Sequence, residues 1–470
     1  MRSEITGRVL KNSILRGLGY PLGAVLLSLT YILIARYLGT DGFGHFSFIM
    51  AFTGLFQIVA DMGIRNILIR NISTDRPNFG LHLQIARFLM RRLSILSGAM
   101  IVIGSSCLNI DNEIRQAVYI AGTGVIFMIN GLSYGSVIRA FEDMGWDILG
   151  FNLHKIIFVA LVWAVTKTEF GIRGVFLAFL FSNAALWLYL WGVVGIRYGQ
   201  GAPGADVKKS AYALLREAIP LGMAEILKRL MRDIDKLLLT ALGSPSAVGL
   251  FSAPYKLLEA MTQFTVNLTL SLFPAYSRLA KISSAGLFEL WLQSLEFLYI
   301  AAVPLAVTIF IFSEQIMELL FGASFREASS VLKILAPAVI LIFSSGVYSY
   351  IFVALEQQRR YLCCIALSLG VNTAADIILI PIYSCDGAAI GTLAGEITLF
   401  FSGLIMLRNS GNSFQALVLL IRPLLAGAVT AFIFLRIRDE TLPIMIAGLC
   451  SGFAAYAGLV FVLKKVRSEK

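Results

Sequence analysis

The chain has 470 residues, of which 58% are hydrophobic and 14% charged, with a mean hydropathy of +0.80 and a formal net charge of +11. These values exclude a soluble globular protein, and no basic soluble segment is present that would bind nucleic acid. The five cysteines lie scattered in apolar sequence without the spacing of a metal site or a disulfide framework, so we expect them to be packing residues. The composition therefore predicts a polytopic membrane protein.

Apolar segments of membrane-spanning length recur fourteen times along the chain. They cover residues 15–38, 43–63, 87–108, 115–138, 147–167, 172–196, 214–242, 249–274, 289–312, 328–355, 360–382, 387–407, 414–436 and 442–463. Most of the 39 Lys and Arg residues fall in segments that are cytoplasmic if both termini are, as the positive-inside rule favours. Because the polar start runs into an apolar segment of spanning length, we expect no cleavable signal peptide. The sequence thus predicts an all-α membrane protein with about 14 transmembrane helices and both termini in the cytoplasm.

An internal repeat divides these spans into two sets of six. The segment RGLGYPLGA from Arg16 resembles REAIPLGMA from Arg216, and a weaker match pairs GFN at 150–152 with GVN at 370–372. Because both sets insert with the same polarity, the repeat is a parallel one. We predict a six-helix N-terminal lobe (1–196), a Gly/Pro-rich cytoplasmic linker (197–212), a six-helix C-terminal lobe (213–407), and a 408–470 addition with two helices and a basic tail.

The stretch Leu214–Gly243 is long enough to cross a bilayer and nonetheless carries eight charged residues. Helical geometry places all of them on one side: Glu217, Glu225, Lys228, Arg229, Arg232, Asp233, Asp235 and Lys236. Because unpaired charges are unfavourable in hydrocarbon, we expect this side to line a wet cavity. Two alternatives stay open. Pairs at i,i+4 spacing, Glu225–Arg229 and Arg229–Asp233, neutralise one another, or the helix lies on the membrane surface.

An ordered set of motifs resembles the membrane flippases of O-antigen and exopolysaccharide biosynthesis, which belong to the multidrug/oligosaccharidyl-lipid/polysaccharide exporter superfamily. The motifs are ILIARYLGTDGFGHFSF, LLREAIPLGM, LGSPSAVGLFSAPYKL, LSLFPAYSRLA, LLFGASF and GVNTAADIILIPIYSCDGAAIGTLAGE. One departure is the turn Ser384-Cys385-Asp386-Gly387, where the family more usually has Gly-x-x-Gly.

The resemblance implies two six-helix bundles that meet in a V around a central cavity. It further implies that the protein flips a polyprenyl-diphosphate-linked oligosaccharide across the bacterial inner membrane by alternating access. The expected partners are this lipid-linked oligosaccharide, membrane lipids, and the polymerase and chain-length proteins of polysaccharide assembly.

Basic residues are the candidates for binding the diphosphate, because Lys and Arg pair with phosphate groups. They lie on the first spans of the two lobes: Arg16, Lys228, Arg232 and Lys256. For Arg16 and Lys256 the alternative is an interfacial charge that extends to the membrane surface. Asn372, one helical turn before Asp376, is a candidate for binding sugar hydroxyls, and its alternative role is an interhelical hydrogen bond.

Two carboxylates, Asp61 and Asp235, are candidates for carrying a coupling proton or cation; the alternative is that they neutralise neighbouring arginines. For His154 and Lys155, near the inner end of the 147–167 span, we expect an interfacial role. The chain has no G-x-x-x-x-G-K-[ST] loop, so we expect no nucleotide cofactor, and energy comes from a proton or sodium gradient or from consumption of the glycan.

Other functions remain as alternatives. A cation-coupled multidrug antiporter of the same superfamily has a similar arrangement of spans. A membrane glycan polymerase or ligase needs acid and base groups in a sizeable outer loop, and every predicted outer loop is short. We therefore expect a transporter and not an enzyme.

Overall fold

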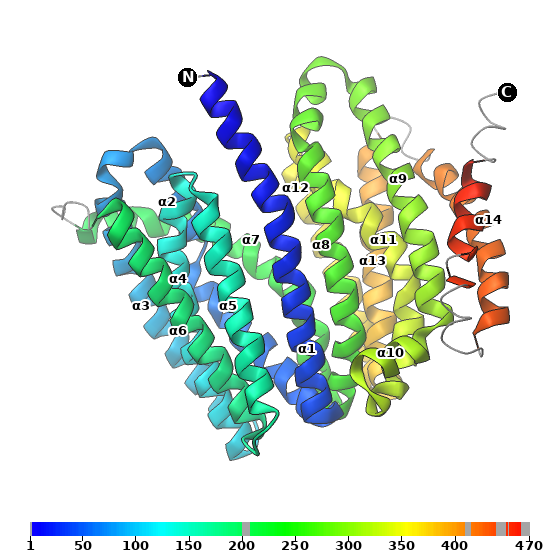
Figure 1. Ribbon diagram of the computed structural model, residues 1–470, viewed down its shortest axis with the longest axis horizontal. Helices are drawn as coiled ribbons and strands as arrows, with labels where there is room; N and C mark the ends of the chain where they lie inside the picture. The colour runs from blue at the N-terminus through cyan, green and yellow to red at the C-terminus, as the bar shows by residue number, and fades with distance from the viewer. Residues whose placement is uncertain (1, 200–206, 409–414, 439–447, 450, 462–470) are drawn as a thin grey trace. The chain divides into compact units, whose positions relative to one another are not determined.

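Helices account for nearly every described residue of the computed structural model, and no strand occurs among them (Figure 1). The structure describes residues 2–199, 207–408, 415–438, 448–449 and 451–461; of residues 2–18, 20, 208–209, 224, 263–264, 267 and 270–271 it describes the backbone alone. Contacts within the chain divide it into two compact units, Met1–Asp233 and Ile234–Lys470. The division lies inside one helix, α7 (Val207–Leu242), which therefore contributes to both units. The lobe boundaries given above stay a prediction.

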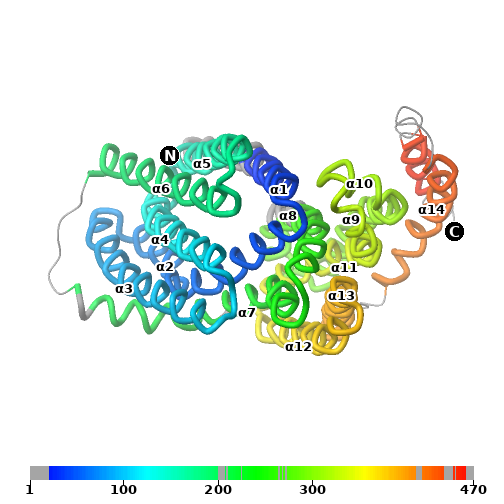
Figure 2. Tube along the Cα trace, turned by 90° about the horizontal axis from the view of Figure 1, so that it is seen from below, coloured from blue at the N-terminus to red at the C-terminus, as the bar shows by residue number. Residues whose placement is uncertain are grey.

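The N-terminal unit contains six further α-helices and a short 3-10 turn in its described part. They are α1 (Arg2–Asp61), α2 (Ile64–Thr74), η1 (Arg76–Asn78), α3 (Phe79–Ser106), α4 (Asn112–Ala140), α5 (Met144–Val165) and α6 (Gly171–Tyr198). α4 packs along α6, and α1 packs against α5 and α3 (Figure 2). α1 breaks at Gly39, whose φ of +68° and ψ of −171° are accessible to glycine alone at little cost.

The C-terminal unit follows with α8 (Pro245–Ile282), α9 (Ser284–Ile311), α10 (Ser313–Phe321), η2 (Ala323–Ala328), α11 (Ser329–Ala354), α12 (Gln358–Tyr383), α13 (Cys385–Leu407) and α14 (Gln415–Ile437). α12 packs on α13, α11 on α8 and α9, and α14 on α9. The side chains of Trp291, Tyr299 and Tyr348 are fully buried among these helices. α10 and η2 form the connection between α9 and α11.

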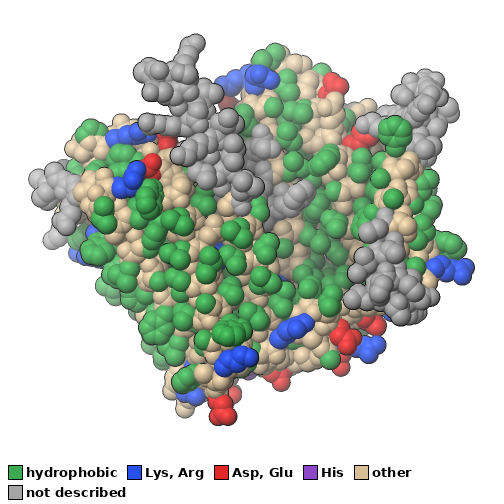
Figure 3. All heavy atoms as spheres, viewed as in Figure 1, with side chains coloured by type: hydrophobic (Ala, Val, Ile, Leu, Met, Phe, Trp, Pro, Cys, Tyr) green, Lys and Arg blue, Asp and Glu red, His purple; other side chains and the backbone are tan. Residues whose placement is uncertain are grey.

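Ten of the described helical segments are long and apolar enough to cross a membrane. One of them, Pro21–Thr74, runs through the break at Gly39 and so includes most of the first predicted span and all of the second. α7 and α8 are not among the ten, and the last predicted span lies partly outside the described residues. Hydrophobic side chains cover the visible flanks of the helices, while charged ones gather towards the helix ends (Figure 3). The prediction of an all-α multi-pass membrane protein is confirmed, and the count of fourteen spans stays a prediction.

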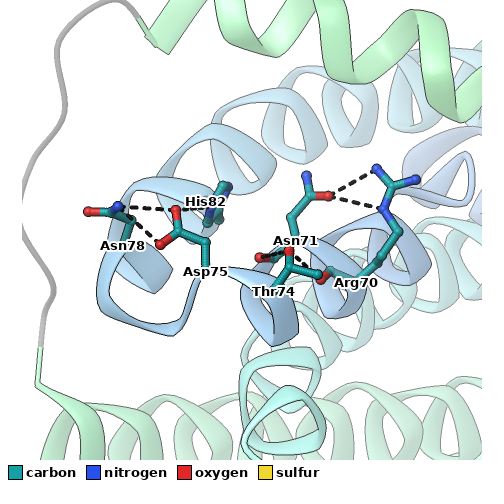
Figure 4. Close-up of polar contacts among 6 residues, drawn as sticks. All are labelled: Arg70, Asn71, Thr74, Asp75, Asn78 and His82. Carbon is teal, nitrogen blue, oxygen red and sulfur yellow. Dashed lines mark hydrogen bonds and ion pairs between the residues drawn. The ribbon is translucent and has the colours of Figure 1, made fainter.

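A hydrogen-bonded turn joins α2 to α3 (Figure 4). The Asn78 side chain donates from Nδ2 to both carboxylate oxygens of Asp75, at 3.1 Å each. His82 Nε2 lies 3.2 Å from Asp75 Oδ2. These hydrogen bonds hold the pKa of Asp75 below its ordinary value of 3.8. The hydrogen bond from Asn78 has the larger effect, and the one with His82 the next largest. The turn is thus closed by an ionised carboxylate with two partners.

Candidate functional site

A row of glycines on α13 brings this helix close to α12. A Cβ on Gly391 would lie 2.0 Å from Asp376 Oδ1, and one on Gly395 would lie 3.0 Å from Asn372 Cβ. The spacing of four residues places these glycines on one face of α13, so the two helices approach within backbone contact. As a result, the polar side chains of Asn372 and Asp376 are enclosed between the helices and kept out of lipid.

Asp235 of α7 joins these two side chains. Asn372 donates from Nδ2 to Asp235 Oδ1 at 2.9 Å, and the carboxyl of Asp376 neighbours that of Asp235. Asp235, Asn372 and Asp376 are 1%, 6% and 0% exposed. Neither oxygen of Asp376 has a hydrogen-bond donor in the described part of the chain, and Asn372 Oδ1 lacks a partner there too. We call Asp235, Asn372 and Asp376 the carboxylate cluster.

The cluster has the chemistry of a site for a proton or a hard cation. Two neighbouring buried carboxylates repel each other, so they coexist only when a proton or a cation lies between them. Carboxylate and amide oxygens are hard ligands, which suit alkali and alkaline-earth cations better than transition metals. Glu396 adds a further buried oxygen, Oε2, that has no partner among the described residues, and it interacts electrostatically with Asp235.

A second group of charges adjoins the cluster along α7 and α8. Lys256 Nζ donates to Glu259 Oε2 at 2.6 Å, and Lys236 Nζ lies 3.7 Å from Glu259 Oε1. Lys236 also lies 4.8 Å from the centre of the Tyr255 ring, a cation–π distance. One carboxylate therefore contacts two lysines, and Lys236 also interacts electrostatically with Asp235.

The α7 charges in the N-terminal unit are arranged differently. Arg229 forms an ion pair with Asp233 and donates to the Met50 carbonyl of α1 at 3.2 Å. Its guanidinium occupies the space above Gly54, where a Cβ would lie 1.8 Å from Nη2. Lys228 pairs with Glu225 at 3.1 Å, and both are exposed.

The family model described as "Polysaccharide biosynthesis protein" matches residues 9–280, more than half of the chain. The chain belongs to this polysaccharide biosynthesis protein family. It is 22% identical over 378 residues to the probable low-salt glycan biosynthesis flippase Agl15 of Haloferax volcanii, a match that covers 79% of this chain and 77% of that protein. The resemblance predicted from the motifs is confirmed.

Two solved structures show the fold of this polysaccharide biosynthesis protein. The lipid II flippase MurJ in an inward closed conformation superposes with a TM-score of 0.77 at 15% identity, over 96% of this chain and 99% of that chain. An inward-facing multidrug resistance MATE family transporter of the MOP superfamily superposes with a TM-score of 0.65 at 15% identity, over 85% and 98% of the two chains. The chain therefore shares the fold of these two structures.

The structure places the site residues predicted for this family member in different surroundings. Asn372 and Asp235, predicted for sugars and for a coupling ion, are bonded to each other. Lys256 is paired with Glu259, whereas Arg232 is exposed on α7. Arg16 lies on α1, but its side chain is outside the described residues.

Asp61, the other predicted coupling carboxylate, sits in a different environment. Arg65 donates from Nε and Nη2 to its two oxygens, each at 2.8 Å, so that its charge is already balanced. This contact matches the alternative interpretation, that the carboxylate neutralises a neighbouring arginine.

The charges of α7 do not share one environment, contrary to the prediction of a single wet face. Asp233, Asp235 and Lys236 are buried, whereas Lys228 and Arg232 are exposed. The physical reason is that α7 passes from one unit to the other, so its two halves meet different neighbours. Of the two predicted i,i+4 pairs, Arg229–Asp233 forms, while Glu225 pairs with Lys228 at i,i+3 instead.

Sequence reasoning missed Glu259 altogether. Its spacing of three residues from Lys256 on a helix is a recognisable signal for an ion pair. The proximity of Asp376 to Asp235 had no such signal, because it depends on packing between helices 141 residues apart in the chain.

Proposed function

We propose that this protein flips a polyprenyl-diphosphate-linked oligosaccharide, an O-antigen or exopolysaccharide repeat unit, from the cytoplasmic to the periplasmic leaflet of the bacterial inner membrane. The observation that carries the proposal is the family match over residues 9–280. The names of Agl15, a glycan biosynthesis flippase, and of MurJ, a lipid II flippase, support the same class of substrate. Both termini lie in the cytoplasm, and polysaccharide polymerase and chain-length proteins are the partners downstream.

The coupling ion in this proposal is a proton or a sodium ion that binds the carboxylate cluster. The support is the pair of neighbouring buried carboxyls, Asp235 and Asp376, of which Asp376 has no hydrogen-bond donor in the described chain. Binding there changes the charge of a buried site, so it favours one conformation of alternating access over the other. The exposed Lys228 and Arg232, together with Arg16 and Lys256, are the proposed contacts for the diphosphate.

The test is the sidedness of undecaprenyl-diphosphate-linked repeat units in inner-membrane vesicles from a strain that lacks this gene. We expect the glycan to stay on the cytoplasmic leaflet, and a plasmid copy of the wild-type gene to move it across. Arg232→Ala is expected to lower the rate of appearance, whereas Arg408→Ala, a change of an exposed arginine after α13, serves as the matched control. Unchanged sidedness with and without the protein contradicts the proposal.

The coupling ion is identified in the same vesicles. Dissipation of the pH gradient alone is expected to stop flipping if the ion is a proton, and removal of sodium alone if it is sodium. Flipping that persists under both treatments contradicts a coupling role for the carboxylate cluster while leaving the flippase function in place.

A multidrug antiporter is the second candidate, because the fold also matches a MATE family transporter. The same deletion strain separates the two functions. An antiporter raises the concentration of cationic drugs that cells tolerate, and it leaves the sidedness of the glycan unchanged. A flippase has the opposite result in both measurements.

A further inference from the structure

One buried lysine of the N-terminal unit has no role in the site described so far. Lys155 is residue 12 of the 22 in α5, so it lies midway along the helix and not near its inner end as the sequence analysis expected. It is 7% exposed. A lysine at the middle of a membrane helix is unfavourable unless it has a partner of opposite charge or a function.

The partners of Lys155 in the described chain are apolar or neutral. Its Nζ lies 4.4 Å from the centre of the Phe151 ring, and no described acidic side chain forms an ion pair with it. The acid nearest in sequence on α5, Asp147, is already bonded to Arg139 at 2.9 Å. A cation–π contact satisfies part of the charge, and none of the described residues forms an ion pair with the ammonium group.

The neighbouring turn of α5 carries a second incompletely bonded polar group. Asn152 is buried, and its Oδ1 has no hydrogen-bond partner in the described part of the chain. It lies one turn before Lys155 and faces α1, where a Cβ on Gly23 would lie 2.9 Å from this oxygen. A rotation of the amide exchanges Oδ1 and Nδ2, so that Asn152 can present a donor at this position, one helical turn before Lys155.

A cation and an adjacent amide at a helix interface are the elements of an anion site. A protein carboxylate would neutralise Lys155 permanently, but no acidic side chain among the described residues pairs with it, so an anionic ligand can supply the opposite charge. The ligand has to reach the middle of a membrane helix, which an anion attached to a lipid chain does and a freely dissolved anion does not.

We propose that Lys155, assisted by Asn152, binds a phosphate group of the isoprenoid lipid substrate at the interface of α1 and α5. This inference rests on the proposed flippase function, and it names a contact for the diphosphate that lies outside the basic residues of α7 and α8.

The experiment measures binding of undecaprenyl diphosphate to the full-length protein in lipid nanodiscs. Lys155→Met keeps the length and the apolar stem of the side chain but removes the charge, and we expect it to weaken binding about ten-fold. Lys155→Arg keeps the charge and is expected to stay within about three-fold of the wild type. Lys167→Met is the matched control, since Lys167 also stacks on an aromatic ring, Trp163, but is exposed at the end of the same helix.

The ligand comparison identifies the source of the phosphate. Undecaprenol, inorganic diphosphate and phosphatidylglycerol are titrated separately. We expect Lys155→Met to affect undecaprenyl diphosphate alone. If inorganic diphosphate or phosphatidylglycerol binds as tightly as undecaprenyl diphosphate, and Lys155→Met lowers its affinity by the same factor, the site is not one for the isoprenoid substrate.

A structural role for Lys155 predicts a different pattern. In that case Lys155→Met lowers the temperature of unfolding while undecaprenyl diphosphate binds as before, and the proposal is wrong. If Lys155→Met does not fold, the wild type decides: an amine-reactive label that enters lipid is applied, and modification of Lys155 is read by peptide mass spectrometry. Protection by undecaprenyl diphosphate but not by undecaprenol supports the proposal, and equal modification with both overturns it.

The vesicle assay separates this inference from the proposed function. If Lys155→Met flips the glycan as fast as the wild type does, the proposed role of Lys155 is wrong and the flippase function stands. A wild type that does not flip the glycan overturns the proposed function itself.

Discussion

The two units bury opposite charges beside asparagines that the sequence repeat pairs, Asn152 and Asn372. Both are buried, and both have an Oδ1 without a partner in the described chain. In the C-terminal unit Asn372 lies beside the carboxyls of Asp235 and Asp376. In the N-terminal unit the residue one turn after Asn152 is Lys155. Both units thus bury an asparagine in close helix packing, but the neighbouring charges differ in sign and in position, since Lys155 follows Asn152 by three residues and Asp376 follows Asn372 by four.

The packing that encloses these groups is alike in kind but uses different helices. In the C-terminal unit the glycines belong to α13, and in the N-terminal unit they belong to α1, at Gly19 and Gly23. Glycine lets two backbones approach, so a polar side chain between them is shielded from lipid without a large neighbour. Helix packing therefore sets where a polar group is buried, and the identity of one nearby residue sets which ion it attracts.

The largest effect is expected from a substitution that removes one buried carboxyl from the C-terminal unit. Asp235→Asn removes one of two neighbouring carboxyls, so no proton or cation is needed to relieve repulsion. We expect the coupling ion to lose its effect and the flipping rate to fall about a hundred-fold, which corresponds to about 2.8 kcal/mol at about 1.4 kcal/mol per decade. The measurement is glycan sidedness in vesicles with and without the ion gradient.

Asp61→Asn is the matched control for this change. Asp61 is an intramembrane carboxylate as well, but its charge is balanced by Arg65. We expect the gradient dependence of flipping to persist in Asp61→Asn. A pattern in which Asp61→Asn abolishes it and Asp235→Asn does not would reverse the assignment of the coupling residue.

A second prediction separates packing from ion binding on α13. An alanine Cβ at Gly391 meets Asp376 Oδ1, the end of a side chain that can turn away, so we expect the ion affinity to fall about ten-fold with little loss of stability. An alanine at Gly387 meets the Leu379 carbonyl at 2.4 Å, a backbone atom that cannot turn away. Gly387→Ala is therefore expected to destabilise the protein by about 1–3 kcal/mol.

The control for this pair is Gly370→Ala on α12, where a Cβ meets no atom within 4 Å. It is expected to change stability by less than about 0.5 kcal/mol. Thermal unfolding of the purified variants, with and without the coupling ion, is the measurement. Equal losses of stability in Gly387→Ala and Gly391→Ala contradict the distinction.

The helices of both units follow from hydropathy, because an apolar run of spanning length has few other conformations in a membrane. For that reason the predicted spans coincide with described helices along most of the chain, including the break at Gly39. Contacts between helices do not follow from a periodic pattern in one helix. The neighbouring carboxyls of Asp235 and Asp376 and the pairing of Lys256 with Glu259 depend on which helices pack together.

Lys155 illustrates the same limit within a single helix. Its predicted place near the inner end came from counting residues from the start of a span, and α5 begins three residues earlier than the predicted span. The structure instead puts the lysine midway along α5, against Phe151. Charge in a span signals a special site, but the helix partner determines what that site binds.

A third prediction concerns the turn of the C-terminal unit that departs from the family pattern. Ser384 has a φ of +53° and a ψ of −126°, which a residue with a Cβ adopts only under strain. Ser384→Gly removes the Cβ, and we expect it to stabilise the protein by about 1 kcal/mol. Ser384→Ala keeps the Cβ and is expected to have no such effect in thermal unfolding. Stabilisation by alanine as well would mean that the hydroxyl and not the backbone is unfavourable.

The turn between α2 and α3 in the N-terminal unit is held by hydrogen bonds to Asp75, and a change there should have the smallest effect because the turn is exposed. The pKa of Asp75 is lowered in the folded protein, first by the bond from Asn78, so its contribution to stability is present above the ordinary carboxyl pKa of 3.8 and disappears as the pH falls through the lower folded value. We expect Asp75→Asn to unfold at a lower temperature than the wild type at neutral pH, with a constant difference down to about pH 5. The difference should then shrink at more acidic pH.

In Asn78→Ala the pKa of Asp75 returns towards its ordinary value, so a wild-type advantage over that variant should fade over the same acidic range. If the unfolding temperatures of the wild type and Asp75→Asn differ by the same amount at pH 3 as at pH 7, the ionised carboxylate does not stabilise this turn.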